Sequence, residues 1–349
     1  PEQKERIIKA VRDGYLCLDA SYVGVHTTAC SEEEMFQLVR YSHEMEKQTG
    51  KPVDVFVQVD IPGISWGVVP ALAHEGIRYV MTMTNTRIRG NIDEKPFWWV
   101  GPDGKSKVMY FPVPGYGSGS KKGRWTGRPW FGQLDRSKIP DVIKTDNPRA
   151  IFLDGLLFRQ LPLMEKEKHP YDIYVTTWCL WDNGLIDADL PEAVRSWNED
   201  YAYPHIIIAG AHEIMETFEK KYGDKLPIVK GDYTEYWTNG LGTHPKELAM
   251  NRKTKERLVQ AETLWSMLHP GQPAPRTDFD EAWRLNLLGL EHTYGFERTN
   301  EPPYFKRLIV KVKQQYFREA ELRSELLLED AIGPAAGKND GYTGLDYDK

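Results

Sequence analysis

The stretch VDVFVQVDIPG, residues 53–63, decides the fold class. Valine stands at every second position from Val53 to Val59, which is the period of a β-strand, and a turn with proline and glycine follows. The next residues predict a helix over 68–75, closed by Gly76, and then a buried strand over 77–83. A strand, a helix and a strand in this order indicate two parallel strands joined by a crossover helix.

The same alternation continues along the chain to about residue 240. Further strands are expected at residues 171–177 and 206–209, and further helices at 191–197 and 213–221. Between residues 88 and 150 the alternation is interrupted by a predicted β-hairpin, 98–100 with 107–111, and by a predicted loop over 112–132. Residues 1–240 are therefore expected to form most of a seven-stranded type of β/α barrel that lacks its first strand.

The remaining chain has a helical pattern throughout. Helices are expected over residues 245–268, 278–295 and 304–331, the second beginning with an Asp278-x-x-Glu281 capping box. Short loops between three helices predict an antiparallel three-helix bundle over residues 241–332. Residues 333–349 read as a linker to a missing C-terminal region, and the start inside a helical pattern at 2–12 suggests that the chain is a fragment.

Composition narrows the classes of partner. The 349 residues carry a net charge of −6, which argues against nucleic acid, and the apolar runs are too short for a membrane span. The three cysteines have no CxxC spacing, so the pattern supports neither a disulfide framework nor a thiolate zinc site. Eleven tryptophans favour a carbohydrate ligand, although aromatic side chains also fill cores. Neither the compartment nor the oligomeric state can be read from these numbers.

Asp60 is the first candidate for a functional residue. It lies at the carboxyl end of the predicted strand, and in β/α barrels the side chains at that end face the active site. The alternative is that Asp60 caps the turn over residues 61–63, which is a common use of aspartate. Position alone does not decide between the two interpretations.

His292 is the second candidate. Leu285, Leu288 and His292 share one face of the predicted second helix, so the imidazole is expected on the packed side. A lone histidine in such a place is more often a core residue than a ligand. Zinc accepts both aspartate and histidine, so Asp60 and His292 could supply half of a zinc site, but two ligands are too few.

Several short segments carry a family resemblance by their order and spacing. They are Gly14-Tyr15 with Asp19-Ala20, then Asp60-Ile-Pro-Gly63, Val69-Pro-Ala-Leu and Gly76-Ile-Arg-Tyr, then Tyr236-Trp237-Thr238-Asn239-Gly240, Thr243-His244-Pro245 and Arg252, and finally Leu287-Leu-Gly-Leu-Glu-His292-Thr293. With these segments the chain resembles glycoside hydrolase family 38, the zinc-dependent retaining α-mannosidases, along most of its length.

The resemblance implies a role for each matching residue. Asp60 would be both the nucleophile and a zinc ligand, and His292 a second zinc ligand, with the other two ligands of the Zn²⁺ ion upstream of Pro1. Asp182 would be the general acid, unless it is only a turn residue. The substrate contacts would come from Trp237, Trp66 and Asn85, although either tryptophan could instead pack a core or a helix. The implied activity is cleavage of α-mannosides in oligosaccharides.

The sequence also departs from the family pattern. Thr293 replaces the aspartate that follows the ligand histidine, an expected arginine is replaced by Thr84 or Asn85, and the glutamate expected between Asp19 and Ala20 is missing. Two alternatives therefore stay open. One is a catalytically inactive carbohydrate-binding homologue. The other is a metal-dependent polysaccharide deacetylase, although the H-x-x-x-H pair usual in such enzymes is not present.

Overall fold

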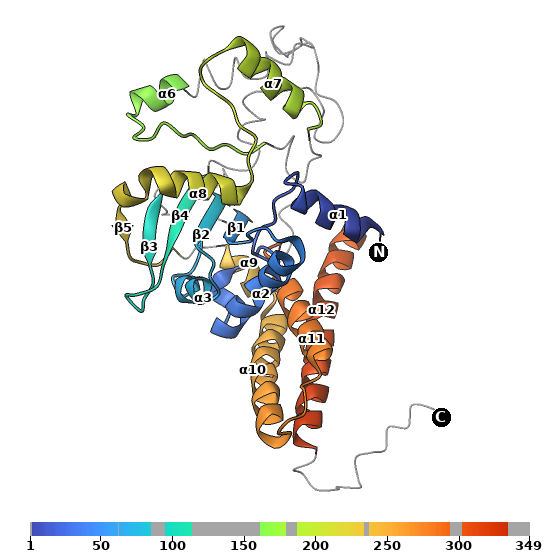
Figure 1. Cartoon of the computed structure of the whole chain (residues 1–349). Coiled ribbons are helices and arrows are strands. Elements are labelled where there is room, and N and C mark those ends of the chain that lie inside the picture. The colour runs from blue at the N-terminus through green and yellow to red at the C-terminus, as the bar shows by residue number, and fades with distance from the viewer. Residues whose placement is uncertain are drawn as a thin grey trace. The chain divides into compact units, whose positions relative to one another are not determined.

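The computed structural model describes residues 2–61, 63–84, 95–113, 161–178, 187–233, 237–293 and 302–333. The protein is a mixed α/β protein with one five-stranded sheet and several helices (Figure 1). Its contacts divide it into two compact units. The first unit comprises Pro1–Ser21 and Ser42–Tyr233, and the second comprises Tyr22–Tyr41 and Thr234–Lys349.

The sheet of the first unit confirms the parallel strands expected around Asp60. Its strands are β1 (Val55–Asp60), β2 (Tyr79–Thr84), β3 (Phe97–Val100), β4 (Lys107–Val113) and β5 (Ile228–Val229), in the order β1-β2-β4-β3-β5. Strand β2 lies parallel to β1 and to β4, and Asp60 is in register with Thr84. The described strands thus form part of an α/β domain, and closure into a barrel stays a prediction.

The predicted hairpin is also confirmed, as β3 and β4 pair antiparallel. Asp103 organises the turn, because its Oδ1 accepts hydrogen bonds from the backbone N–H of Lys105 at 3.0 Å and from Ser106 Oγ at 2.7 Å. Gly104 has φ +69°, a left-handed conformation that favours glycine. These contacts are local, which is why the sequence alone could predict the hairpin.

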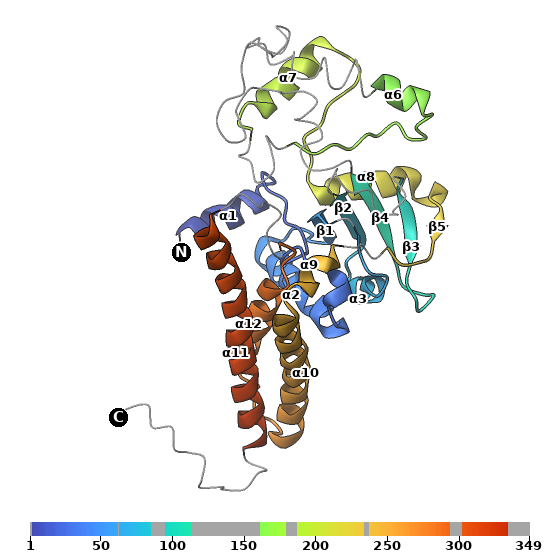
Figure 2. The same ribbon diagram turned by 180° about the vertical axis from the view of Figure 1, so that it is seen from behind.

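The helices of the first unit lie where the sequence predicted helices, except the one at 161–166, which was not predicted. They are α1 (Glu2–Arg12), α3 (Val68–His74), α6 (Leu161–Lys166), α7 (Leu190–Asp200) and α8 (Ala211–Tyr222). Helix α8 lies along one face of the sheet (Figure 2), where Met215 and Phe218 pack against Val55, Met81 and Phe111. The opposite face carries Gln58, Thr82, Tyr110, Phe97 and Trp99, all of them buried.

Two predicted strands, 171–177 and 206–209, are not strands in the part of the chain that the structure describes. At the second of them, the Asn198 side chain takes the place of a neighbouring strand. Its Oδ1 accepts from the Ile206 N–H at 2.9 Å and its Nδ2 donates to the Ile206 carbonyl at 2.7 Å. A side chain therefore satisfies the backbone groups that a ladder would have used.

The second unit is helical. Its elements are the 3₁₀ turn Thr27–Ala29, α9 (Thr238–Gly242), α10 (Pro245–Leu268), α11 (Arg276–Gly289) and α12 (Pro303–Ile332), and the boundary between the units passes through α2 (Glu32–Thr49). Helices α10, α11 and α12 pack side by side around one apolar cluster (Figure 2). The cluster consists of Leu258, Ala261, Phe279, Ala282, Trp283 and Leu327.

Helix α11 differs from its prediction at both ends. It begins at Arg276 after Pro275, and the expected capping box does not form, because Glu281 instead accepts hydrogen bonds from Arg284. It ends at Gly289, well before the predicted residue 295. There is no room for a side chain at Gly289, since an added Cβ would lie 2.6 Å from the ring of Phe317 in α12.

A buried carboxylate joins α2 to the helices of this unit. Glu34 is fully buried, and its Oε1 accepts from Nδ2 of Asn251 at 2.8 Å and of Asn286 at 2.7 Å. Its Oε2 accepts from Lys255 Nζ at 3.0 Å and from the Ser31 N–H at 2.7 Å. Ser31 and Glu34 also form a reciprocal capping box, because Ser31 Oγ accepts from the Glu34 N–H at 3.3 Å.

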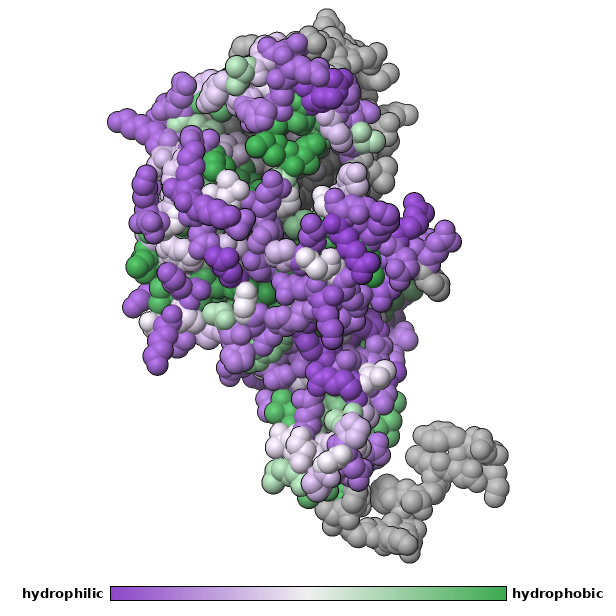
Figure 3. Space-filling model, viewed as in Figure 1, coloured by the Kyte–Doolittle hydropathy of each residue, from purple (hydrophilic) through white to green (hydrophobic). Residues whose placement is uncertain are grey.

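The surface of the described residues is largely hydrophilic on the face shown in Figure 3, with hydrophobic residues exposed in places, including the lower end of the helical unit. Among the helices that the structure describes, none combines the length and the apolar character needed to cross a membrane.

Candidate functional site

Asp60 occupies the last position of β1 with an unusual backbone conformation. Its φ is +74°, in the left-handed region that residues other than glycine seldom adopt. Aspartate tolerates this region better than most residues, but the conformation still costs free energy and persists only where surrounding structure imposes it. Such residues cluster at functional sites, so the backbone favours the functional interpretation of Asp60.

The loop after Asp60 is held in place by hydrogen bonds within the first unit. The Ile64 N–H donates to the Tyr233 carbonyl at 2.9 Å, and the Trp66 N–H donates to Asp232 Oδ1 at 3.0 Å. The indole Nε1 of Trp66 donates to the Val100 carbonyl at 2.8 Å. Trp66 therefore fixes this loop against the sheet, and its contact with a substrate stays a prediction.

His292 lies in the segment after α11, not within the helix as the sequence predicted. Helix α11 ends at Gly289, and the chain then pairs with residues 24–26 of the same unit. The His292 N–H donates to the Gly24 carbonyl at 2.9 Å, and the His292 carbonyl lies 3.2 Å from Nε2 of the buried His26. Backbone contacts with residues 24–26 thus position the imidazole. The periodicity of the sequence does not reveal contacts with such a distant segment.

The His292 ring has a carboxylate beside it. Its Nδ1 lies 2.8 Å from Glu291 Oε1, and Glu291 Oε2 accepts from Lys313 Nζ at 2.8 Å. Burial alone would raise the pKa of Glu291, but His292 and Lys313 together hold that pKa well below its usual range. Burial lowers the pKa of Lys313, although Glu291 acts in the opposite direction.

A carboxylate on one ring nitrogen is the arrangement that orients a metal-binding histidine and makes its other nitrogen more basic. The sequence analysis missed Glu291, and its position directly before His292 was the available signal. Trp237 lies near the His292 ring. Its ring is nearly parallel to that of His292, with 5° between the planes and 6.5 Å between the centroids.

The other predicted site residues are placed as follows. Asp60 and Trp66 belong to the first unit, and His292 and Trp237 to the second. Asp182 and Asn85 lie outside the described residues. Within the described ranges, histidine, cysteine, aspartate and glutamate nowhere gather in a group of three or more that could hold a metal ion. Zinc binding by Asp60 and His292 therefore stays a prediction.

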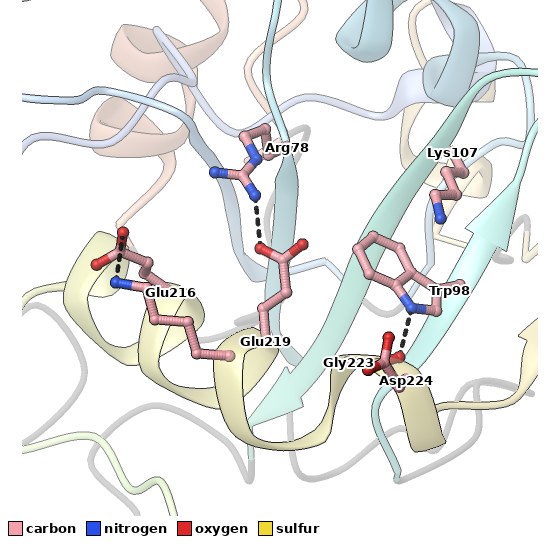
Figure 4. Close-up of a pocket in the computed structure, with 8 residues that line it drawn as sticks. Arg78, Trp98, Lys107, Glu216, Glu219, Gly223 and Asp224 are labelled. Carbon is pink, nitrogen blue, oxygen red and sulfur yellow. Dashed lines mark hydrogen bonds and ion pairs between the residues drawn. The ribbon is translucent and has the colours of Figure 1, made fainter.

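A surface pocket of about 520 Å³ lies at the other end of the strands (Figure 4). Arg78 precedes β2 and Lys107 begins β4, so the pocket opens at their amino ends. Its basic groups already have partners, with Arg78 2.7 Å from Glu219, Lys220 2.9 Å from Glu216, and Lys107 over the Trp98 ring at 4.3 Å. Active sites of parallel α/β architectures form at the carboxyl ends of the strands, so this pocket is not the candidate site.

Comparisons with known proteins agree with the predicted fold. The sequence matches no described protein family and no curated protein. An alpha-mannosidase from Enterococcus faecalis V583 shares the fold with a TM-score of 0.69 at 16% identity, over 96% of this chain and 36% of its own. A protein in the glycosyl hydrolase family 38 from Enterococcus faecalis gives 0.59 at 17%, over 96% and 33%. A GH57 branching enzyme from Thermococcus kodakaraensis gives 0.52 at 11%, over 95% and 68%.

The chain has a glycoside-hydrolase-like fold. The expected resemblance to family 38 is thereby confirmed at the level of the fold. The chain spans about a third of the length of the two Enterococcus faecalis structures, which it covers to 36% and 33%.

Proposed function

We propose that this chain belongs to a retaining α-mannosidase of the family 38 type, in which Asp60 is the nucleophile. The observation that carries the proposal is the left-handed conformation of Asp60, φ +74°, at the carboxyl end of β1. A need to point the carboxylate toward a ligand would account for the backbone strain at this position. The shared fold with a bacterial alpha-mannosidase supports the same assignment.

The chemistry proceeds in two displacements. A carboxylate oxygen of Asp60 attacks the anomeric carbon of the mannoside while a carboxylic acid protonates the leaving oxygen, and a glycosyl ester forms. Water then attacks the anomeric carbon, the same acid residue now accepts a proton from that water, and Asp60 leaves as the carboxylate. Asp182 is our candidate for the acid, which needs to lie about 5–5.5 Å from the nucleophile.

Zinc is part of the proposal, with Asp60 and His292 as the ligands that this chain supplies. Glu291 beside Nδ1 of His292 favours Nε2 as the coordinating nitrogen. A bound zinc ion would act as a Lewis acid toward the hydroxyl oxygens of the sugar. Because two ligands leave a tetrahedral site incomplete, no step above depends on the metal.

Substrate contacts are assigned to aromatic and amide side chains. Trp237 offers an indole face for stacking against a sugar ring, while Asn85 and Trp66 are the other candidates. The ring of Trp237 also lies nearly parallel to His292, so a sugar stacked on Trp237 would reach the same part of the second unit.

The test is hydrolysis of an aryl α-mannoside by the natural full-length protein, with and without a chelator. Asp60→Asn should lower turnover about a thousand-fold or more, equivalent to about 4 kcal/mol of the activation barrier. The matched control is Asp54→Asn, just before β1, where Asp54 pairs with His212 Nδ1 at 2.7 Å. This control should reduce stability but not turnover.

Three results would separate the alternatives. Sugar binding without turnover by the wild-type protein would identify an inactive carbohydrate-binding homologue. Release of acetate from acetylated sugars would identify a deacetylase. Full activity of the Asp60→Asn variant would remove the assignment of the nucleophile.

A further inference from the structure

Helix α12 has an apolar stripe on its outer face. Its buried side is formed by Phe317, Ala320, Ser324, Leu327 and Ala331, which pack within the second unit. At about 100° per residue, the opposite side carries five exposed hydrophobic residues. They are Tyr304, Leu308, Val312, Leu322 and Leu326, exposed by 70%, 45%, 42%, 56% and 52%. Spacings of four residues, interrupted only in the middle of the helix, place them in one row.

Four of these five residues are arranged symmetrically about the middle of the helix. Leu308 and Leu326 lie nine residues to either side of Phe317, and Val312 and Leu322 lie five residues to either side. Turning the helix end for end therefore brings each of these side chains onto the other member of its pair. Such a self-complementary face is what a two-fold symmetric interface requires.

The charges of α12 differ between the two halves of the helix. From residue 303 to 318 there are five basic residues and no acidic one, whereas from 319 to 332 there are five acidic residues and one basic. Two parallel copies would place like charges together. Two antiparallel copies place the basic half of each helix against the acidic half of the other, which is favourable.

We propose that two copies of this chain associate through antiparallel α12 helices. Leu308 packs on Leu326 of the second copy, and Val312 packs on Leu322, each contact occurring twice by symmetry. On the flank of the stripe, Arg307 faces Glu329 of the second copy. This interface is independent of the proposed hydrolase activity.

Other occupants fit this face less well. An anionic membrane or an acidic protein would attract the basic half of α12 but repel the acidic half, with its five carboxylates. A second copy satisfies both halves at once. The centre of the row is polar, because Gln315 and Glu319 occupy it, so the apolar contact consists of two separate patches.

The expected affinity is modest. A 30-residue helix is about 45 Å long, and one face of it offers fewer than the roughly 20–30 residues a side of a standard interface. We therefore expect a dissociation constant of roughly 1–100 µM, in the range of small interfaces.

Sedimentation velocity of residues 1–349 over about 1–300 µM tests the proposal, since this range spans the expected dissociation constant. A monomer–dimer equilibrium is expected. Leu308→Asp should shift it to monomer, because the introduced carboxylate would face Leu326 of the second copy. Circular dichroism of the variant checks that α12 still folds. A monomer at every concentration of the wild-type chain would overturn the proposal.

A charge swap tests the antiparallel orientation. Arg307→Glu should weaken the dimer about tenfold, because two symmetric ion pairs become repulsive. Adding Glu329→Arg should restore it, because the pairs reform with their signs exchanged. The control is Lys253→Glu, which makes the same charge change at an exposed position of α10 and should leave the equilibrium unchanged. A swap that fails to restore the dimer would overturn the antiparallel pairing.

Discussion

Replacing Glu34 by glutamine tests whether the second unit depends on its buried carboxylate. Glu34 accepts hydrogen bonds at both oxygens, from Asn251 and Asn286 at Oε1 and from Lys255 and Ser31 at Oε2. A glutamine side chain has the same shape but only one acceptor oxygen. In one orientation the amide NH₂ group would face Lys255, and in the other it would face the two asparagines. The donors that it faces would lose their acceptor.

The magnitude follows from this loss. Breaking a buried pair while leaving its partner charged costs about 3–5 kcal/mol, which is a large part of a typical stability of about 5–15 kcal/mol. Urea unfolding gives the free energy, and hydrogen exchange of α10 and α11 shows that the second unit is the part affected. The matched control is Glu32→Gln, at an exposed position in the same turn of α2, which should cost about 0.3–1 kcal/mol.

The reasoning would be refuted if Glu34→Gln and Glu32→Gln differed by less than about 1 kcal/mol, the net contribution of a single ordinary hydrogen bond. Unchanged hydrogen exchange in α10 and α11 would refute it as well, because the predicted loss would then lie elsewhere.

Three further predictions concern packing, pH and metal. Gly289→Ala should lower stability by about 1–3 kcal/mol, because its Cβ would meet the Phe317 ring at 2.6 Å, whereas Gly242→Ala, with nothing within 4 Å, should not. Desolvation raises the pKa of Asp19 to about 6 even though part of the residue is exposed, so the folded state binds the proton more tightly and stability should fall as the pH rises from about 4 to about 6. Asp19→Asn should remove that fall in urea titrations at each pH. Residues 1–349 should bind zinc only weakly by calorimetry, since two ligands cannot hold it, and tight one-to-one binding would contradict this.

Local signals made much of the fold predictable. Helix α10 has the predicted bounds because Pro245 suits the first turn of a helix and Pro270 cannot continue one. The hairpin of β3 and β4 depends on Asp103 and Gly104 within the turn itself. The end of α11 was not predictable in this way, because it depends on contacts with residues 24–26 and with Phe317.

The candidate site could be predicted only in part. The position of Asp60 at the end of a strand follows from the valine alternation before it, but its left-handed backbone does not. The sequence placed His292 inside a helix, and its carboxylate neighbour Glu291 went unnoticed, since periodicity describes helix faces and not the segments that follow them. Glu291 and His292 are adjacent in the sequence, but the contact between their side chains depends on how the backbone turns after α11.

The Glu34 network has a consequence for synthesis on the ribosome. Glu34 and Asn251 are separated by 217 positions, and Glu34 and Asn286 by 252. At roughly 5–20 residues per second, the carboxylate emerges about 10–40 s before the first of these amides exists. Residues 22–41 of the nascent chain must therefore avoid non-native contacts while most of the first unit is synthesised. A chaperone acting on this early segment would raise the yield of native protein.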